Sequence, residues 1–165
     1  MKKFTLLSAL ILAATLCGAE NLLTRTLWYP LGGAKQSIVD YVGKEIRCRN
    51  DGTSSREGVR YVYKPKTPVS GKLVFSAESK LSGVPAGATL KKHGHYSIYL
   101  DLSYADGTKK FGICAPFTYA NHDWEKVSGE FVAAKPVVQV NYYLLFRNVA
   151  GDARFRNATL SVEQP

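Results

Sequence analysis

The side chains best suited to bind a ligand lie along residues 137–148, which read VVQVNYYLLFRN. This stretch is the longest strand signal in the chain, and successive side chains of a strand point to opposite faces. One face suits a hydrophobic core and carries Val138, Val140, Tyr142, Leu144 and Phe146. The other face carries Gln139, Asn141, Tyr143, Leu145 and Arg147. Amide, phenol and guanidinium groups on one face can stack against a flat ligand and exchange hydrogen bonds with it.

Residues 96–104 form a second stretch with the same chemistry. Its apolar side carries Ile98, Leu100 and Leu102, and its other side carries Ser97, Tyr99, Asp101 and Ser103, preceded by His95. If the two strands share a concave sheet, Tyr143 and Tyr99 line one groove. Such a groove suits a sugar ring, which offers an apolar face of C–H bonds and a rim of hydroxyl groups. The alternative is that this side faces water or lies beneath a loop.

Two further residues are candidates for contact with the same ligand. Trp28 falls in an early stretch beside Tyr29 and Pro30, where a loop residue could reach the rim of a site. Arg60 lies in a strand whose apolar phase holds Val59, Tyr61 and Tyr63, so its guanidinium points to the other side. We expect Trp124, which precedes an alternating strand, to belong to the core.

Catalytic and metal-binding patterns are weak in this chain. His93 and His95 alternate, and His122 could join them, but no cysteine or glutamate lies nearby in sequence, so we expect no metal site. Asp123 and Glu125 are close enough to suggest paired carboxylates, although such acids are more often solvated. There is no Gly-x-Ser-x-Gly turn, phosphate-binding glycine loop or His-Glu-x-x-His motif.

The first nineteen residues have the pattern of a bacterial signal peptide. A basic start, Lys2 and Lys3, precedes an apolar run and a small-residue end at Ala19. The run is too short for an ordinary membrane span. We expect cleavage after Ala19 and export to the periplasm or the medium, leaving residues 20–165 as one domain without a membrane span.

The balance of charge is basic. The formal net charge is +9, and it falls to +7 without the two leader lysines. An anionic glycan or another acidic partner would suit this balance, but the basic residues are scattered, and only Lys91-Lys92 and Lys109-Lys110 are adjacent. We therefore expect a solvated basic surface, with an acidic-ligand patch as the alternative, and no nucleic acid as partner.

Two cysteines, Cys48 and Cys114, follow the leader. In an exported protein they could form a disulfide, whereas two buried free thiols are the alternative. The sequence leaves both readings open.

The rest of the chain supplies short strands separated by turns. Alternating stretches occur at residues 37–42, 44–49, 59–64, 71–80, 96–104, 110–115, 124–132, 137–148 and 153–162. Asn50-Asp51-Gly52 and Asp106-Gly107 are strong turn signals between them. No helical period persists beyond the leader, so the sequence predicts an all-β sandwich or barrel.

The order of these parts resembles the jelly-roll carbohydrate-binding modules of the cellulase type, families 4, 9 and 22, which are galactose-binding-domain-like. The resemblance rests on YKPKTPVSGKLVFSAESK, YLDLSYADGT, DWEKV and GDARFRNATLSV, and it covers most of residues 20–165. It implies a two-sheet antiparallel jelly-roll β-sandwich that binds glycan chains in a groove, often with a structural calcium ion.

Two features depart from the family pattern. Members commonly have acidic residues in the last strand that can help to hold calcium, where this chain has Arg156 and Asn157. Asn157 is a poorer calcium ligand, so a structural calcium ion is less favoured here and stays an alternative. Members are also usually attached to a glycoside hydrolase, whereas we expect residues 20–165 to form a single free-standing module.

We therefore expect a non-catalytic module that holds a poly- or oligosaccharide by aromatic stacking and hydrogen bonds. Its expected ligand-binding residues are Tyr143, Tyr99, Asn141, Gln139, Arg147, Asp101, Trp28 and Arg60. Two alternatives stay open. One is a structural or protein-interaction sandwich, and the other is a small lyase or hydrolase that uses Tyr143, His95 and Arg147 to remove a proton beside a uronate.

Overall fold

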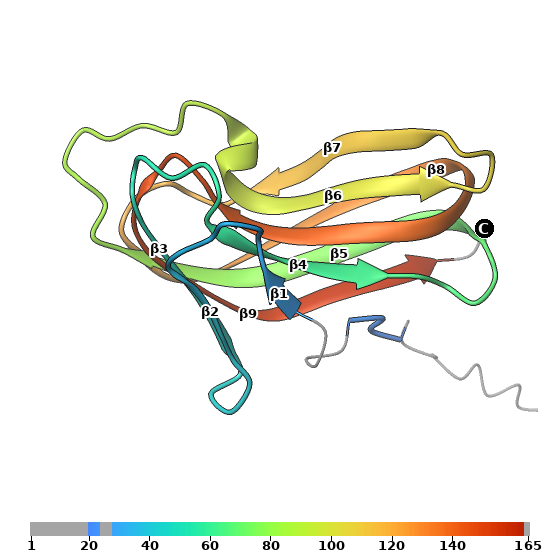
Figure 1. Ribbon diagram of the computed structural model, residues 1–165, viewed down its shortest axis with the longest axis horizontal. Helices are drawn as coiled ribbons and strands as arrows, with labels where there is room; N and C mark the ends of the chain where they lie inside the picture. The colour runs from blue at the N-terminus through green and yellow to red at the C-terminus, as the bar shows by residue number, and fades with distance from the viewer. Residues whose placement is uncertain (1–19, 24–27, 164–165) are drawn as a thin grey trace, which may run out of the picture.

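The computed structural model describes residues 20–23 and 28–163, and the predicted leader, residues 1–19, lies outside the described residues. The regular structure of the described part is almost entirely β (Figure 1). The strands are β1 (Trp28–Pro30), β2 (Ser37–Asp40), β3 (Glu45–Asp51), β4 (Gly58–Tyr63), β5 (Val69–Ser82), β6 (Tyr96–Tyr104), β7 (Lys109–Pro116), β8 (His122–Phe146) and β9 (Ala150–Glu163), with a short 3-10 turn, η2 (His93–His95). No helix of the described residues is long and apolar enough to cross a membrane.

The strands form two antiparallel layers that share β8. The first half of β8 pairs with β5, and its second half pairs with β4 and β6. The β8/β6 sheet therefore runs β1-β4-β8-β6-β7, and the β5/β9 sheet runs β8-β5-β9-β3-β2. This arrangement confirms the predicted all-β jelly-roll sandwich (Figure 1). The sequence pattern predicted two separate strands at residues 124–132 and 137–148. The structure instead has one long strand, β8, which passes from one sheet to the other.

The core lies between the two sheets and follows the predicted alternation. Val140, Tyr142, Leu144 and Phe146 are fully buried, as are the inward residues of β6. The Tyr142 hydroxyl donates a hydrogen bond to the Ser76 carbonyl, 2.8 Å away, and so joins the two sheets. Burial of large apolar side chains on both sheets supplies the main stabilising free energy.

The predicted inward orientation is wrong at Val138, the first residue assigned to the apolar face of residues 137–148. Val138 is only partly buried, and Val137 takes the inward position with no exposed surface. The cause is a register shift, because Ser103 pairs with Gln139 whereas the next residue, Tyr104, pairs with Val137. One extra residue in a strand moves the following side chains to the other face.

The disulfide that the sequence allowed does not form, because Cys48 and Cys114 are both free thiols. Cys48 lies on the inner side of β3 and is completely buried, and burial raises the pKa of its thiol to about 12. Cys114 is exposed on β7 and pairs in register with Tyr99 on the outer side. The two thiols therefore lie on opposite sides of the β8/β6 sheet and cannot approach each other.

Candidate ligand-binding face

The structure places every predicted ligand-binding residue except Trp28 on the outer side of the β8/β6 sheet. We call this surface the tyrosine face and define it by Arg60, Tyr99, Asp101, Gln139, Asn141, Tyr143 and Arg147. Strand register sets its rows, because side chains of directly paired residues point to the same side. Arg60 pairs with Tyr143, which pairs with Tyr99, and in the next row Asn141 pairs with Asp101.

The two tyrosines meet edge to face. Their ring centroids are 5.9 Å apart and their planes cross at 70°. The Arg147 guanidinium lies over the Tyr99 ring, 5.9 Å from its centroid. Both tyrosines keep part of their surface exposed. Rings crossed at this angle form a shaped surface rather than a flat plate.

Asp101 is the carboxylate of the tyrosine face. It interacts with the hydroxyl groups of Tyr143 and Tyr99, and the amide of Gly112 donates to it over 3.4 Å. Burial nonetheless raises the pKa of Asp101 above its ordinary value. The pKa of Tyr143 is also raised, first by burial and then by the nearby Asp101 charge. The face therefore holds a partly desolvated hydrogen-bond acceptor between two phenols.

Two side-chain amides extend the polar row along β8. Gln139 Nε2 donates to Asn141 Oδ1 over 3.0 Å, and both residues are half-buried. This bond orients the pair, and within the described residues the amide N–H groups of Asn141 donate no hydrogen bond. The pair can therefore donate to a ligand hydroxyl from a fixed position.

At one end of the face, polar atoms are buried without partners. They are Arg147 Nε, His95 Nδ1 and Ser97 Oγ, for which the described part of the chain supplies no hydrogen bond. Arg147 is held from its other atoms, because its backbone amide donates to the His95 carbonyl over 2.8 Å and Nη2 donates to Gly94 O over 3.3 Å. Buried atoms of this kind usually bind ordered water or mark a functional region.

Trp28 does not belong to the rim of this site, and the expectation that it does is wrong. It begins β1 and is only 6% exposed. Its ring packs edge to face against Tyr61 at 5.5 Å and Tyr142 at 5.7 Å. The reason is that β1 pairs with β4, with Trp28 opposite the inward residue Tyr61.

The core prediction for Trp124 is also wrong. Trp124 is partly exposed on the outer side of the β5/β9 sheet, and the Arg156 guanidinium lies 3.8 Å from its ring centroid. Arg156 Nε also donates to Glu78 over 2.7 Å, as does Asn157 Nδ2 over 3.0 Å. Arg156 and Asn157, which stand where the resembled modules commonly have acidic residues, thus both bind Glu78. No group of three histidine, cysteine or acidic residues that could hold a metal occurs within residues 20–23 and 28–163.

The remaining candidates for chemistry form no single cluster, although His122 Nε2 lies 3.7 Å from Glu125 Oε2. His95 belongs to η2, whereas His122 lies 3.4 Å from the Tyr96 hydroxyl, at the end of the core. Asp123 forms an ion pair with Lys80 at 2.9 Å. Glu125 accepts hydrogen bonds from the backbone and hydroxyl of Thr118. The two carboxylates that suggested a catalytic pair thus have separate structural partners.

Two hollows away from the tyrosine face were not predicted from the sequence. One, of about 250 Å³, lies beside β1, β3 and β9 and is lined in part by Leu23, Trp28, Tyr41 and Phe155. The other, of about 490 Å³, is polar and lies along residues 33–36 and 49–57. The lining of the first hollow comes from segments far apart in sequence, so no local pattern signals it, whereas the second is formed by two neighbouring segments.

No protein-family model matches the sequence, and no curated protein matches it. Solved structures do match. Xylanase 10B of Clostridium thermocellum, solved as its CBM22-1 and GH10 modules complexed with xylohexaose, has 14% identity and a TM-score of 0.58 over 87% of this chain and 27% of that chain. The CBM22-1-CBM22-2 tandem domain of Xyn10C from Paenibacillus barcinonensis has 13% identity and a TM-score of 0.55 over 89% of this chain and 46% of that chain.

These structures are much longer than the matched region, since this chain spans about a quarter of the first and less than half of the second. At such low identity the likeness concerns the fold. The chain therefore has the jelly-roll β-sandwich fold of carbohydrate-binding modules, as the sequence resemblance implied.

Proposed function

We infer that this protein is an exported, non-catalytic module whose tyrosine face binds a glycan chain. The observation that supports this most strongly is the register of three strands, which brings Arg60, Tyr143 and Tyr99 into one row and Asn141 and Asp101 into the next. Aromatic rings flanked by amide and carboxylate groups suit sugar rings. The proposal follows from this arrangement of side chains, because a fold by itself does not set a function.

Each part of the face has a distinct task in this proposal. The exposed ring surface of Tyr143 and Tyr99 packs against the C–H face of a sugar. Asp101 accepts hydrogen bonds from hydroxyl groups, and Asn141 donates and accepts from its fixed orientation. Stacking supplies much of the affinity, and the hydrogen bonds set which hydroxyl pattern fits, because a buried polar group left unpaired costs free energy.

Catalysis is the less favoured function for this face. Glycoside hydrolysis commonly uses two carboxyl groups, and Asp101 is the one carboxylate among the residues that define the face. A lyase acting through Tyr143, His95 and Arg147 would need a phenol that ionises readily. Burial raises the pKa of Tyr143, and burial together with the neighbouring cations lowers the pKa of His95. The shift of Tyr143 opposes a phenolate base, and the shift of His95 makes its imidazole a weaker proton acceptor.

The experiment is a glycan array probed with the purified protein, followed by calorimetry on the glycans that bind. Xylo-oligosaccharides are a natural first probe, because the similar xylanase 10B structure was complexed with xylohexaose. We expect Tyr143→Ala to weaken binding at least about tenfold, in line with losing one aromatic contact. An assay for unsaturated uronate products on the same glycans addresses the lyase alternative.

The matched control is Trp124→Ala, which removes a partly exposed aromatic ring from the other sheet. Both variants should keep the far-ultraviolet circular dichroism spectrum of the unaltered protein. Equal losses in the two variants, or undiminished binding by Tyr143→Ala, would place the site elsewhere. Binding of no glycan would favour the structural or protein-interaction alternative.

A further inference from the structure

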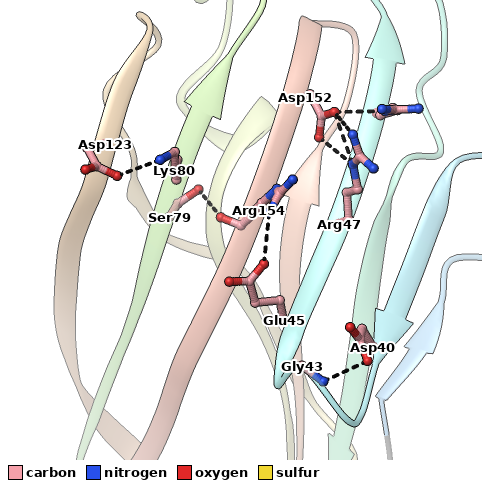
Figure 2. A network of polar contacts seen from close by, with 10 residues as sticks. Asp40, Gly43, Glu45, Arg47, Ser79, Lys80, Asp123, Asp152 and Arg154 are labelled. Atoms are coloured by element: carbon pink, nitrogen blue, oxygen red, sulfur yellow. Dashed lines mark hydrogen bonds and ion pairs between the residues drawn. The ribbon is translucent and has the colours of Figure 1, made fainter.

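The outer side of the β5/β9 sheet neutralises its basic residues with carboxylates. Figure 2 shows part of this network, in which Asp152 binds Arg47 and a second guanidinium group while Arg154 faces Glu45. The ion pairs of this side are Arg47–Asp152, Arg49–Asp152, Arg154–Glu45, Arg156–Glu78, Lys80–Asp123, Lys72–Glu130 and Lys72–Glu163. Little unbalanced positive charge remains there.

The tyrosine face is different, because its two arginines have no such partner. Within the described part of the chain, neither Arg60 nor Arg147 forms an ion pair. Lys91 and Lys92 add positive charge beside η2, where they act on His95. The single carboxylate of the face, Asp101, interacts with the two phenol hydroxyls, and burial raises its pKa.

The two arginines also flank the aromatic rings. Arg60 is exposed and lies directly opposite Tyr143 on β4, and it interacts with the Tyr143 hydroxyl. Arg147 lies four residues beyond Tyr143, roughly 13 Å along the strand direction, and its guanidinium lies over Tyr99. A ligand stacked on either ring therefore has a guanidinium group beside it.

We propose that the tyrosine face selects anionic glycans, and that Arg60 and Arg147 bind the carboxylate groups of uronate residues in the chain. This proposal rests on the proposed function of the same face. A guanidinium group matches a planar carboxylate with two parallel hydrogen bonds, which lysine cannot do. The unpaired arginines thus supply the specificity, and the tyrosines supply the stacking surface.

A single-stranded nucleic acid also combines aromatic stacking with negative charge, but the face suits it less well. Asp101 lies in the row beside the two tyrosines, where it accepts hydrogen bonds, and a phosphodiester has none to donate. The rings of Tyr99 and Tyr143 are nearly perpendicular, so they cannot form successive parallel platforms for bases. A carboxylate acceptor is instead useful toward sugar hydroxyl groups.

The test compares acidic glycans with neutral forms of the same chains. One pair is glucuronoxylan oligosaccharides before and after carboxyl reduction, and the other is oligogalacturonate and its methyl ester. Calorimetry at low and at physiological salt should show at least about tenfold tighter binding of the acidic form in one of these pairs, with the preference reduced by salt. Arg147→Gln and Arg60→Gln should each remove most of that preference, so that the acidic form loses more affinity than the neutral form of the same chain.

The control variant is Arg154→Gln, which removes the same charge from the opposite sheet and should leave the preference intact. An equal loss in this variant would indicate general attraction and overturn the assignment of the two arginines. Equal binding of acidic and neutral forms would overturn the inference while the proposed glycan function stands. Absence of binding to both pairs would overturn the inference, and the glycan array then decides the proposed function separately. Tighter binding of a mixed-sequence single-stranded DNA would overturn it in favour of nucleic acid.

Discussion

The two outer faces of the sandwich use the same kinds of residue in different ways. On the β5/β9 sheet, Arg156 stacks on Trp124 and also binds Glu78. On the tyrosine face, Arg147 lies over Tyr99 but has no carboxylate partner within the described residues. Each face therefore has an aromatic ring with an arginine above it. The difference is the carboxylate of Glu78, which pairs with Arg156. Arg147 has no equivalent partner among the described residues, and we propose that a ligand supplies it.

The two aspartates of these faces show the same contrast. Hydrogen bonds from Arg47 lower the pKa of Asp152, so the fold favours its charged form. Burial raises the pKa of Asp101, so the fold disfavours its charged form. Groups that a fold holds in an unfavourable state are common at functional sites, whereas satisfied ion pairs serve stability. The contrast separates a face whose charges stabilise the fold from the face that we propose for binding.

The largest loss of stability should come from Tyr142→Ala, which removes a core side chain that connects the two sheets. Tyr142 is fully buried and bonds across the core to Ser76. We expect a loss of about 3–5 kcal/mol in the free energy of unfolding, because a large cavity opens in the core. Urea unfolding followed by circular dichroism measures it. A loss below about 1 kcal/mol would show that the two sheets do not depend on this side chain.

A smaller loss is expected from Asp152→Asn on the neutralised face. Asp152 is bound by both Arg47 and Arg49, so its removal leaves two guanidinium groups without a partner. We expect about 1–2 kcal/mol less stability at pH 7. Because the folded-state pKa of Asp152 is lowered, this stabilisation is present above its unfolded value of about 4 and is lost as the pH falls through the folded value. The unaltered protein and the variant should thus converge in strong acid, and a constant difference would exclude the ion pairs as its cause.

Asp101→Asn should have the opposite sign. A raised folded-state pKa means that the ionised carboxylate costs stability at neutral pH, and that this cost is absent below the unfolded value of about 4. The amide should therefore raise the free energy of unfolding at pH 7 by about 0.5 kcal/mol and give no gain at low pH. The same urea series at several pH values measures both. A destabilised variant would place Asp101 with the structural carboxylates and remove the contrast with Asp152.

Local alternation was enough to predict most strands and most of the tyrosine face. Residues 96–104 form β6 with the predicted ends, and Asn141 and Tyr143 share one side of β8 as expected, with Arg147 just beyond the end of the strand and over Tyr99. The fold class also followed from the regular spacing of short strands and turns. These features succeed because they depend on side-chain alternation within one strand.

The failures concern features that depend on pairing between distant strands. Trp28 and Trp124 were assigned to the wrong environments, because the side that a strand residue faces is set by its partner strand and register. A register shift displaced Val138 for the same reason. The ion pairs that distinguish the two faces join residues up to 109 positions apart, as Glu45 and Arg154 do. No local pattern contains that information.

The smallest effect, and the one that needs the least change to the protein, is the difference between the two thiols. Cys114 is exposed beside the tyrosine face. Cys48 is buried on the inner side of β3, and burial raises the pKa of its thiol to about 12. We expect iodoacetamide at pH 8 to alkylate Cys114 in the folded protein and Cys48 only after unfolding, with no change in the unfolding midpoint. Peptide mass spectrometry identifies the labelled residue, and a reducing agent should alter neither result. Equal labelling of both thiols without denaturant would mean that the β5/β9 sheet opens readily. The ion pairs on its outer side would then not stabilise it as proposed above.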